Sequence, residues 1–227
     1  MSGELVLYTI PSSHACRSAT LMLEHKGMRW KERELPATTQ RMLMRAFGFR
    51  GNTVPAVKLD GTRVQTNRRI ARFLDELQPE PRLVPADRQA EIEAAERVSD
   101  EILQPLARRL LLAAGSRDME EVDRCGDGGR LGALLAGNRR QRRFVVWLAA
   151  RYFRAASVEE LDRKALPGVL DHVDKLVGRG VLNAEQLTAA DFETAPCLAL
   201  LDYRLDLRPL VRPRPSWTLV ERLLPDP

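Results

Sequence analysis

Short apolar runs and amphipathic stretches alternate along the first third of the chain. Runs rich in β-branched and aromatic residues predict strands, and apolar residues that recur every three or four positions predict helices. The Asp60-Gly61 pair predicts a tight turn that folds one strand back on the next. The expected order is a strand at 4–10, a helix at 16–26, a strand at 28–35, a helix at 39–49, hairpin strands at 53–57 and 62–65, and a helix at 68–77 capped by Asn67.

These elements follow the order β-α-β-α and then β-β-α. The first half indicates parallel strands joined by a crossover helix, and the second half indicates an antiparallel hairpin. Val54-Pro55 stands at the entrance to the third strand, where a proline removes a donor from the ladder. This order, with a proline opening the third strand, is the thioredoxin arrangement, and it favours a cis peptide bond before Pro55.

The rest of the chain has helical periodicity in every long segment. Residues 79–86, which precede it, are rich in proline and lack periodicity, and this indicates a linker. The sequence therefore predicts an α/β plus all-α fold, with a thioredoxin-like domain at 1–78 and a helical bundle at 87–227. The expected helices cover 87–114 (kinked at Pro105), 119–136 (interrupted at 125–129), 138–153, 158–177, a segment that follows a capping box of Thr188 and Asp191, and 216–224.

Composition narrows the class of protein. Of the 227 residues, 44% are hydrophobic, which is enough for cores in two domains, and no apolar run is long enough to cross a membrane. The first residues lack the basic and apolar regions of a signal peptide. Cys16, Cys125 and Cys197 lie too far apart for a disulfide framework or a zinc site. We therefore expect a cytoplasmic protein with no membrane partner and no metal.

The net charge of +5 does not by itself indicate a nucleic-acid partner. Acidic and basic residues are interleaved along the chain, and the excess is small for this length. The basic cluster at 139–143 fits the start of a surface helix, so no nucleic acid is expected. The three histidines, His14, His25 and His172, have no cysteine or carboxylate at ligand spacing, which also argues against a metal site.

Four segments of the sequence resemble the cytosolic glutathione S-transferase (GST) family. They are the first strand and the turn after it at 7–16, the Val54-Pro55 pair, the segment 64–74, which is similar to the family's Glu/Gln-Ser-x-Ala-Ile signature, and the capping box at 187–192. The resemblance covers nearly the whole chain, and the order and separation of the four segments are specific for the fold. The resemblance implies the GST fold, in which a thioredoxin-like domain precedes an all-helical domain.

The resemblance also implies an enzyme that ionises a bound thiol and lets the thiolate attack an apolar electrophile. A free thiol is mostly protonated at neutral pH, so a hydroxyl donor at a helix N-terminus would favour the thiolate. Ser13 aligns best with the family's catalytic serine or cysteine, and Ser12 would take this role if the turn were shifted. Either serine could instead be only an N-cap. Tyr8, a further hydroxyl, lies within a strand, where packing is expected.

Cys16 is the third candidate at this turn. The segment 13–16 has the spacing of a C-x-x-C redox motif whose first cysteine is replaced by Ser13. No partner thiol lies nearby, so disulfide reduction by two cysteines is excluded here. We expect Cys16 to be a small buried residue, and a redox or dehalogenase-type reaction through its thiol is the minority interpretation.

The resemblance implies that the thiol is bound by Val54, Pro55, Thr66 and Asn67. In the family, the residue before the cis-proline pairs its backbone with the bound tripeptide, and an acid-serine pair binds the γ-glutamyl group. Thr66 stands at the acid position and cannot supply the negative charge. Asn67 stands at the serine position and can still donate to a carboxylate.

Two arginine pairs bear on the choice of substrate. Arg68 and Arg69 follow Asn67, and they indicate a more acidic thiol, the loss of tight thiol binding, or simply solvated side chains. Arg108 and Arg109 lie along the helix that, by the resemblance, would border the electrophile pocket, where solvated side chains are again expected.

The function expected from the resemblance is a GST-like transferase. Glutathione or a related thiol would be its co-substrate, no metal would be needed, and the family implies a homodimer. The alternative is a non-catalytic binding or regulatory protein of the same fold, which Thr66 and Asn67 favour because they replace the acid-serine pair.

Overall fold

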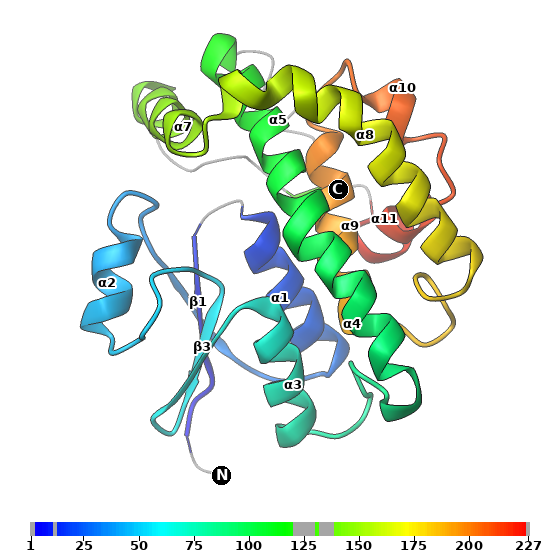
Figure 1. Cartoon of the computed structure of the whole chain (residues 1–227). Helices are drawn as coiled ribbons and strands as arrows, with labels where there is room; N and C mark the ends of the chain where they lie inside the picture. Colours follow the sequence, from blue (N-terminus) through cyan, green and yellow to red (C-terminus); the bar gives the residue numbers. More distant parts are fainter. Residues whose placement is uncertain (1–2, 11–12, 120–129, 132–138, 226–227) are drawn as a thin grey trace.

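The chain folds into a four-stranded sheet flanked by helices, followed by a larger helical part (Figure 1). The computed structural model describes residues 3–10, 13–119, 130–131 and 139–225. It confirms the predicted fold class, because the sheet has the thioredoxin-like arrangement and the regular elements after it in the described residues are all helices.

The sheet has the strand order β2-β1-β3-β4. Its strands are β1 (Val6–Thr9), β2 (Lys31–Glu34), β3 (Ala56–Leu59) and β4 (Thr62–Gln65). β1 pairs in parallel with β2 and antiparallel with β3, and β3 pairs antiparallel with β4. Asp60 and Gly61 join β3 to β4 with φ angles of 45° and 89°. Positive φ at both central residues is the geometry that an Asp-Gly hairpin turn favours, so the predicted hairpin is confirmed.

Three helices cover this sheet: α1 (His14–His25), α2 (Gln40–Ala46) and α3 (Asn67–Leu77). Side chains alternate between the two faces of a strand. Leu7 therefore joins the core beneath α1 and α3, whereas Tyr8 joins a smaller cluster with Met44 of α2. Figure 1 shows α1 and α3 side by side on one face and α2 on the other.

Asn67 does not cap α3 as predicted. The helix begins at Asn67 itself, and Thr66 occupies the cap position with a φ of 75°. The Asn67 side chain turns towards α1, where its Nδ2 donates to the carbonyl of Ala15 at 3.1 Å. The prediction was wrong because a contact with another helix recruits a side chain that the local sequence assigns to the cap.

The helical part begins with one long, interrupted stretch. Its elements are η1 (Ala86–Arg88), α4 (Gln89–Arg97), the π-helical η2 (Val98–Leu103), α5 (Gln104–Arg117), α7 (Arg139–Tyr152), α8 (Ala155–Gly178), α9 (Ala189–Leu201), α10 (Arg208–Val211) and α11 (Trp217–Leu223). A π-helical stretch directly precedes Pro105, where a single kinked helix was expected. Proline cannot donate to the carbonyl four residues before it, and the wider hydrogen bonding upstream accommodates this loss. The helix expected at 119–136 lies almost entirely outside the described residues.

Helix α9 is the centre of the helical part, and all of its residues are buried. Its predicted capping box is present: the carboxylate of Asp191 accepts from the Thr188 N–H at 2.8 Å and from the Thr188 hydroxyl at 2.9 Å. α9 packs against α1, α4 and α5, so one apolar cluster runs from Leu7 in the sheet to Leu198 in α9. The two parts thus share a core, and the linker at 79–86 stays a prediction.

Candidate active site

The start of α1 is the point on which the candidate site is built. Ser13 occupies the N-cap position of α1, and its Oγ accepts from the Cys16 N–H at 3.3 Å. This bond uses an acceptor position of the hydroxyl, so its proton can be donated, either to the Cys16 thiol or to a ligand. Ser13 is half-buried, and the backbone N–H groups of the first turn lie beside it. The capping interpretation and the thiol-activating interpretation are therefore compatible in one side chain. Ser12 lies outside the described residues.

Cys16 is buried, as expected. Burial raises the pKa of its thiol to about 11, and hydrogen bonds from Ser13 and the Ile10 backbone only partly oppose this. The thiol is therefore protonated at neutral pH, which removes the nucleophilic form. Tyr8 is also buried, and it packs against Phe47 and Phe49 at ring-centroid distances of 5.3 and 5.2 Å.

The peptide bond between Val54 and Pro55 is cis, as predicted. Val54 precedes β3, and in the described part of the chain neither its N–H nor its carbonyl has a hydrogen-bond partner. Free backbone groups at this place can pair with an extended ligand. The carbonyl of Pro55 accepts from the Thr66 N–H at 3.4 Å, which holds this loop against the start of α3.

Three contacts bring the predicted site residues together. The Thr66 N–H donates to the Pro55 carbonyl, and the Asn67 side chain donates to the carbonyl of Ala15 in the first turn of α1. The Ser13 N–H donates to the carbonyl of Ile10, directly after β1, at 3.4 Å. The starts of α1, β3 and α3 therefore converge. Asn67 is buried, and its Oδ1 has no hydrogen-bond partner in the described residues.

The two arginines after Asn67 differ from each other. Arg69 is exposed, as the solvated interpretation expects. Arg68 turns towards α4, where its Nε lies 3.8 Å from the carboxylate of Glu96. Glu96 is fully buried and is held mainly by Arg72, whose two terminal nitrogens both bind it. Arg68 is therefore directed towards the helical part and away from the thiol side.

The expectation that Arg108 and Arg109 are solvated is wrong. Arg109 forms a two-point ion pair with Asp162 of α8, with both N–O distances at 2.7 Å. Arg108 is half-buried, and its guanidinium lies 4.3 Å from the centroid of the Phe153 ring. The periodicity of α5 could not distinguish the two neighbours, because the partner of each comes from a distant segment.

His14 is a site residue that the sequence did not single out. It follows Ser13 directly, it is buried, and its Nε2 has no hydrogen-bond partner in the described residues. Burial, and secondarily the positive charge of Arg108, lower the pKa of His14 to about 3. The imidazole is therefore neutral, and the cation of Arg108 acts on the first turn of α1, which in Figure 1 points towards α5.

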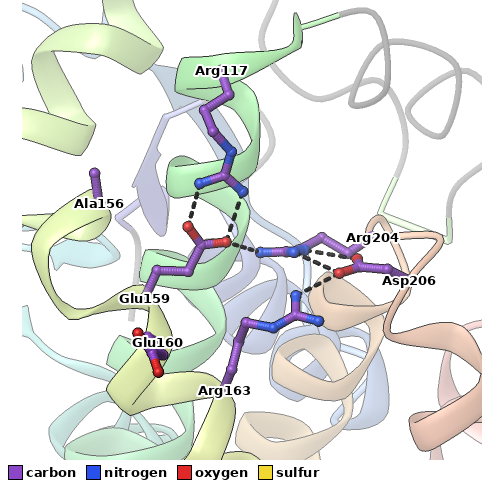
Figure 2. A pocket seen from close by; sticks show the side chains of 7 residues that line it. All are labelled: Arg117, Ala156, Glu159, Glu160, Arg163, Arg204 and Asp206. Atoms are coloured by element: carbon purple, nitrogen blue, oxygen red, sulfur yellow. Dashed lines mark hydrogen bonds and ion pairs between the residues drawn. The ribbon is translucent and has the colours of Figure 1, made fainter.

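A second polar region lies on the far side of α5 and is lined by charged side chains (Figure 2). Arg117 binds Glu159, Glu159 also accepts from Arg204 at 2.8 Å, and Arg204 binds Asp206 in turn. The charges in this hollow satisfy one another, and none of the predicted site residues lines it. We therefore assign it a structural role.

Two further observations concern cofactors and membranes. Among the described residues, no group of three or more His, Cys, Asp or Glu side chains is placed to hold a metal ion. In the same residues, no helix combines the length and the apolar character that crossing a membrane requires.

Comparison with known proteins agrees with this geometry. Residues 7–82 match the family described as glutathione S-transferase, N-terminal domain. A search of curated proteins finds no match.

Solved structures extend the similarity to the whole chain. A glutathione S-transferase of Ceriporiopsis subvermispora, solved with glutathione, is 15% identical, with 99% of each chain covered and a TM-score of 0.69. The glutathione transferase GSTFuA2 from Phanerochaete chrysosporium is 17% identical, with 98% of this chain and 97% of that chain covered and a TM-score of 0.68. A maleylacetoacetate isomerase from Anaeromyxobacter dehalogenans, with bound dicarboxyethyl glutathione and citrate, is 22% identical, with 98% and 86% covered and a TM-score of 0.57.

At these identities the solved structures establish the fold alone, and the match over 7–82 adds the family of the N-terminal part. The chain has the glutathione transferase fold, and its residues 7–82 match the glutathione S-transferase N-terminal domain family.

Proposed function

We propose that this protein is a glutathione transferase-like enzyme that conjugates a low-molecular-weight thiol to an apolar electrophile, with the Ser13 hydroxyl stabilising the thiolate. The observation that carries the proposal is the position of Ser13 at the N-cap of α1. The cap bond from the Cys16 N–H orients the hydroxyl by its acceptor side, and its proton, which interacts with the Cys16 thiol in the chain alone, would turn to the bound thiol. A donor of this kind, together with the partial positive charge of the helix start, lowers the pKa of a bound thiol.

The reaction balances without a cofactor. The thiol loses its proton to water, and the thiolate sulfur attacks the electrophilic carbon. A new carbon–sulfur bond forms while the leaving group, a halide in the simplest case, departs with its electron pair. Ser13 keeps its own proton and donates a hydrogen bond to the sulfur throughout.

The thiol would lie along Val54. Its unpaired N–H and carbonyl suit the backbone of a peptide-like thiol, and this contact does not depend on the side chain. Fold neighbours were solved with glutathione or with glutathione sulfonate. Thr66 is exposed and uncharged, so an ammonium group receives no counter-charge from this position. We therefore expect glutathione to bind more weakly than in a site with an acidic residue there.

The test is turnover of chlorodinitrobenzene with glutathione by the wild type and by Ser13→Ala. Loss of a hydrogen bond to a charged group is expected to lower kcat/KM roughly 10- to 100-fold. The pKa read from the pH dependence of kcat/KM should rise as well, which a merely structural loss would not produce. Ser13→Thr keeps the hydroxyl and should recover much of the activity.

Cys16→Ala is the matched control. It is three residues away and removes a buried, protonated thiol, so turnover should stay within about two-fold of the wild type. Turnover unchanged in Ser13→Ala would refute the role of Ser13, and turnover lost in Cys16→Ala would support the redox or dehalogenase-type alternative.

A second candidate function is a non-catalytic binding or regulatory protein of the same fold. The neutral Thr66 favours it, because this position lacks the charge that would pair with a γ-glutamyl ammonium. Calorimetry with glutathione separates the two: no measurable heat of binding together with no turnover would favour the non-catalytic function. A homodimer in the cytoplasm belongs to the main proposal, and light scattering tests the dimer.

A further inference from the structure

Two neighbouring arginines on α5 have opposite environments. Arg109 is paired at two points with Asp162, at 2.7 Å each. Arg108 has no ion-pair partner in the described part of the chain, and its buried Nε donates to no acceptor there. Its guanidinium instead lies 4.3 Å from the centroid of the Phe153 ring. Arg108 is thus a half-buried cation without an ion pair, and the charge of Asp100 acts on it only from beyond ion-pair distance.

Four other arginines that are largely withdrawn from water are paired with acids. These pairs join Arg72 to Glu96, Arg109 to Asp162, Arg204 to Asp206 and Arg214 to Asp174. Removing a cation from water costs free energy unless an anion offsets it. Arg108 differs from these four arginines, and an anion supplied by a ligand would offset its charge.

The position of Arg108 links it to the candidate active site. Its charge acts on His14, the residue directly after Ser13. His14 is buried and neutral and has an unpartnered Nε2, so it cannot supply the missing negative charge. The cation therefore acts on the first turn of α1, where the proposed reaction takes place.

Aromatic rings continue from Arg108 towards α2. Phe153 lies edge-on to Tyr152, with ring centroids 4.8 Å apart, and the guanidinium of Arg41 lies 4.5 Å from the Tyr152 ring. Two cations thus stand at the ends of a pair of rings. This combination suits a planar, aromatic body that carries a negative group.

We propose that Arg108 binds a carboxylate on the electrophile, so that the preferred second substrate is an aromatic compound with an anionic group. This inference rests on the proposed transferase function. The backbone slot for the thiol lies at Val54, before β3, whereas Arg108 and Phe153 belong to α5 and the end of α7. The anion is therefore assigned to the electrophile and not to the thiol.

The first test measures binding and needs no turnover. Calorimetry compares dinitrobenzoate with neutral dinitrobenzene, for the wild type, Arg108→Gln and Arg108→Lys. We expect the wild type to bind the benzoate more tightly and Arg108→Gln to lose roughly 10- to 100-fold in its affinity for the benzoate, since a bond to a charged group is removed. Arg108→Lys keeps the charge and should lose less. Equal affinity of wild type and Arg108→Gln for the benzoate would overturn the proposal.

The second test uses chlorodinitrobenzoate and chlorodinitrobenzene as electrophiles, with glutathione. The ratio of the two kcat/KM values should favour the benzoate less in Arg108→Gln than in the wild type, by roughly 10-fold or more. Arg97→Gln removes a positive charge from an exposed position on α4 and should leave the ratio unchanged. An equal fall for both electrophiles in Arg108→Gln would assign Arg108 to packing, and a rise in KM for glutathione alone would assign the anion to the thiol.

The two tests separate the inference from the function on which it rests. If chlorodinitrobenzene is not turned over by the wild type, the transferase function fails. Binding of dinitrobenzoate that depends on Arg108 would then still identify an anion site. If turnover is seen and the ratio does not move, the function stands and the anion site is refuted.

Discussion

Two groups of charged side chains lie on opposite sides of α5, and they are built in opposite ways. In the hollow of Figure 2, Arg117, Glu159, Arg204, Asp206 and Arg163 form a continuous series of ion pairs. Near the candidate site, Arg108 of α5 and the Nε2 of His14 in α1 have no such partners in the described residues. The first group is complete within the chain, whereas the second is where we propose that a ligand binds.

The difference teaches which polar groups this fold uses for its own stability. In the closed group the pKa of Glu159 is lowered to about 2, chiefly because Arg117 donates a hydrogen bond to it. The pair therefore forms without an ion from outside the chain. Arg108 of α5 and His14 of α1 lack an ion pair or hydrogen bond, in the described residues, that would offset the cost of desolvation at Nε and Nε2. Proteins commonly accept such a cost at functional sites, which is why we place function there and structure in the hollow.

The largest expected effect is in the closed group. Arg204 is nearly buried, with 5% of its side chain exposed, and it binds Glu159, Asp206 and the carbonyl of Leu110. Arg204→Met leaves two acids short of a partner and should lower the free energy of unfolding by about 3 kcal/mol, measured by urea denaturation. Arg204→Lys keeps the charge but not the planar guanidinium, so its free energy of unfolding should lie between those of the wild type and Arg204→Met. A loss below about 0.5 kcal/mol would mean that the series of ion pairs is not structural.

The neighbouring arginines of α5 give a matched pair with a smaller effect. Arg109→Met leaves Asp162, which has 7% of its side chain exposed, without its ion-pair partner. The free energy of unfolding should therefore fall by about 2 kcal/mol. Arg108→Met replaces an unpaired cation by an apolar side chain and should stay within about 1 kcal/mol of the wild type. Equal losses in the two variants, measured by the same denaturation, would erase the distinction between paired and unpaired groups.

The smallest effect, over the first pH unit below 6.5, is a pH dependence of about 1.4 kcal/mol due to His14. The pKa of His14 is about 3 in the folded chain, against an ordinary value of 6.5, because burial and then Arg108 disfavour the imidazolium. Between pH 6.5 and pH 3, His14 binds a proton in the unfolded chain but stays neutral in the folded chain. The stability that His14 contributes is thus complete above pH 6.5 and falls by about 1.4 kcal/mol per pH unit towards pH 3.

His14→Gln isolates this contribution from the carboxyl groups, which titrate in the same range. The free energy of unfolding of the variant relative to the wild type should rise as pH falls from 6.5, at the slope given above. Urea denaturation at several pH values measures the difference. A difference that does not change with pH would show that His14 titrates alike in the folded and unfolded chains.

The sequence predicted most of the elements because their signals are local. The strand order follows from the succession of short apolar runs and helices, and the hairpin follows from Asp60-Gly61. The capping box at Thr188 and Asp191 depends on residues three positions apart, and it is present as expected. The sequence failed where distant groups compete, as when the contact with α1 removes Asn67 from the cap of α3.

The candidate site divides in the same way. Ser13 and the cis-Pro55 could be expected from the sequence, since a turn before a helix and a proline at a strand entrance are local features. Tertiary structure alone distinguished Arg108 from Arg109, which are adjacent and chemically identical. Whether an arginine is paired depends on which acid the fold brings within reach, and Asp162 reaches only one of them. Local patterns determine backbone conformation and helix ends, and packing between distant segments decides which charges stay unpaired and open to a substrate.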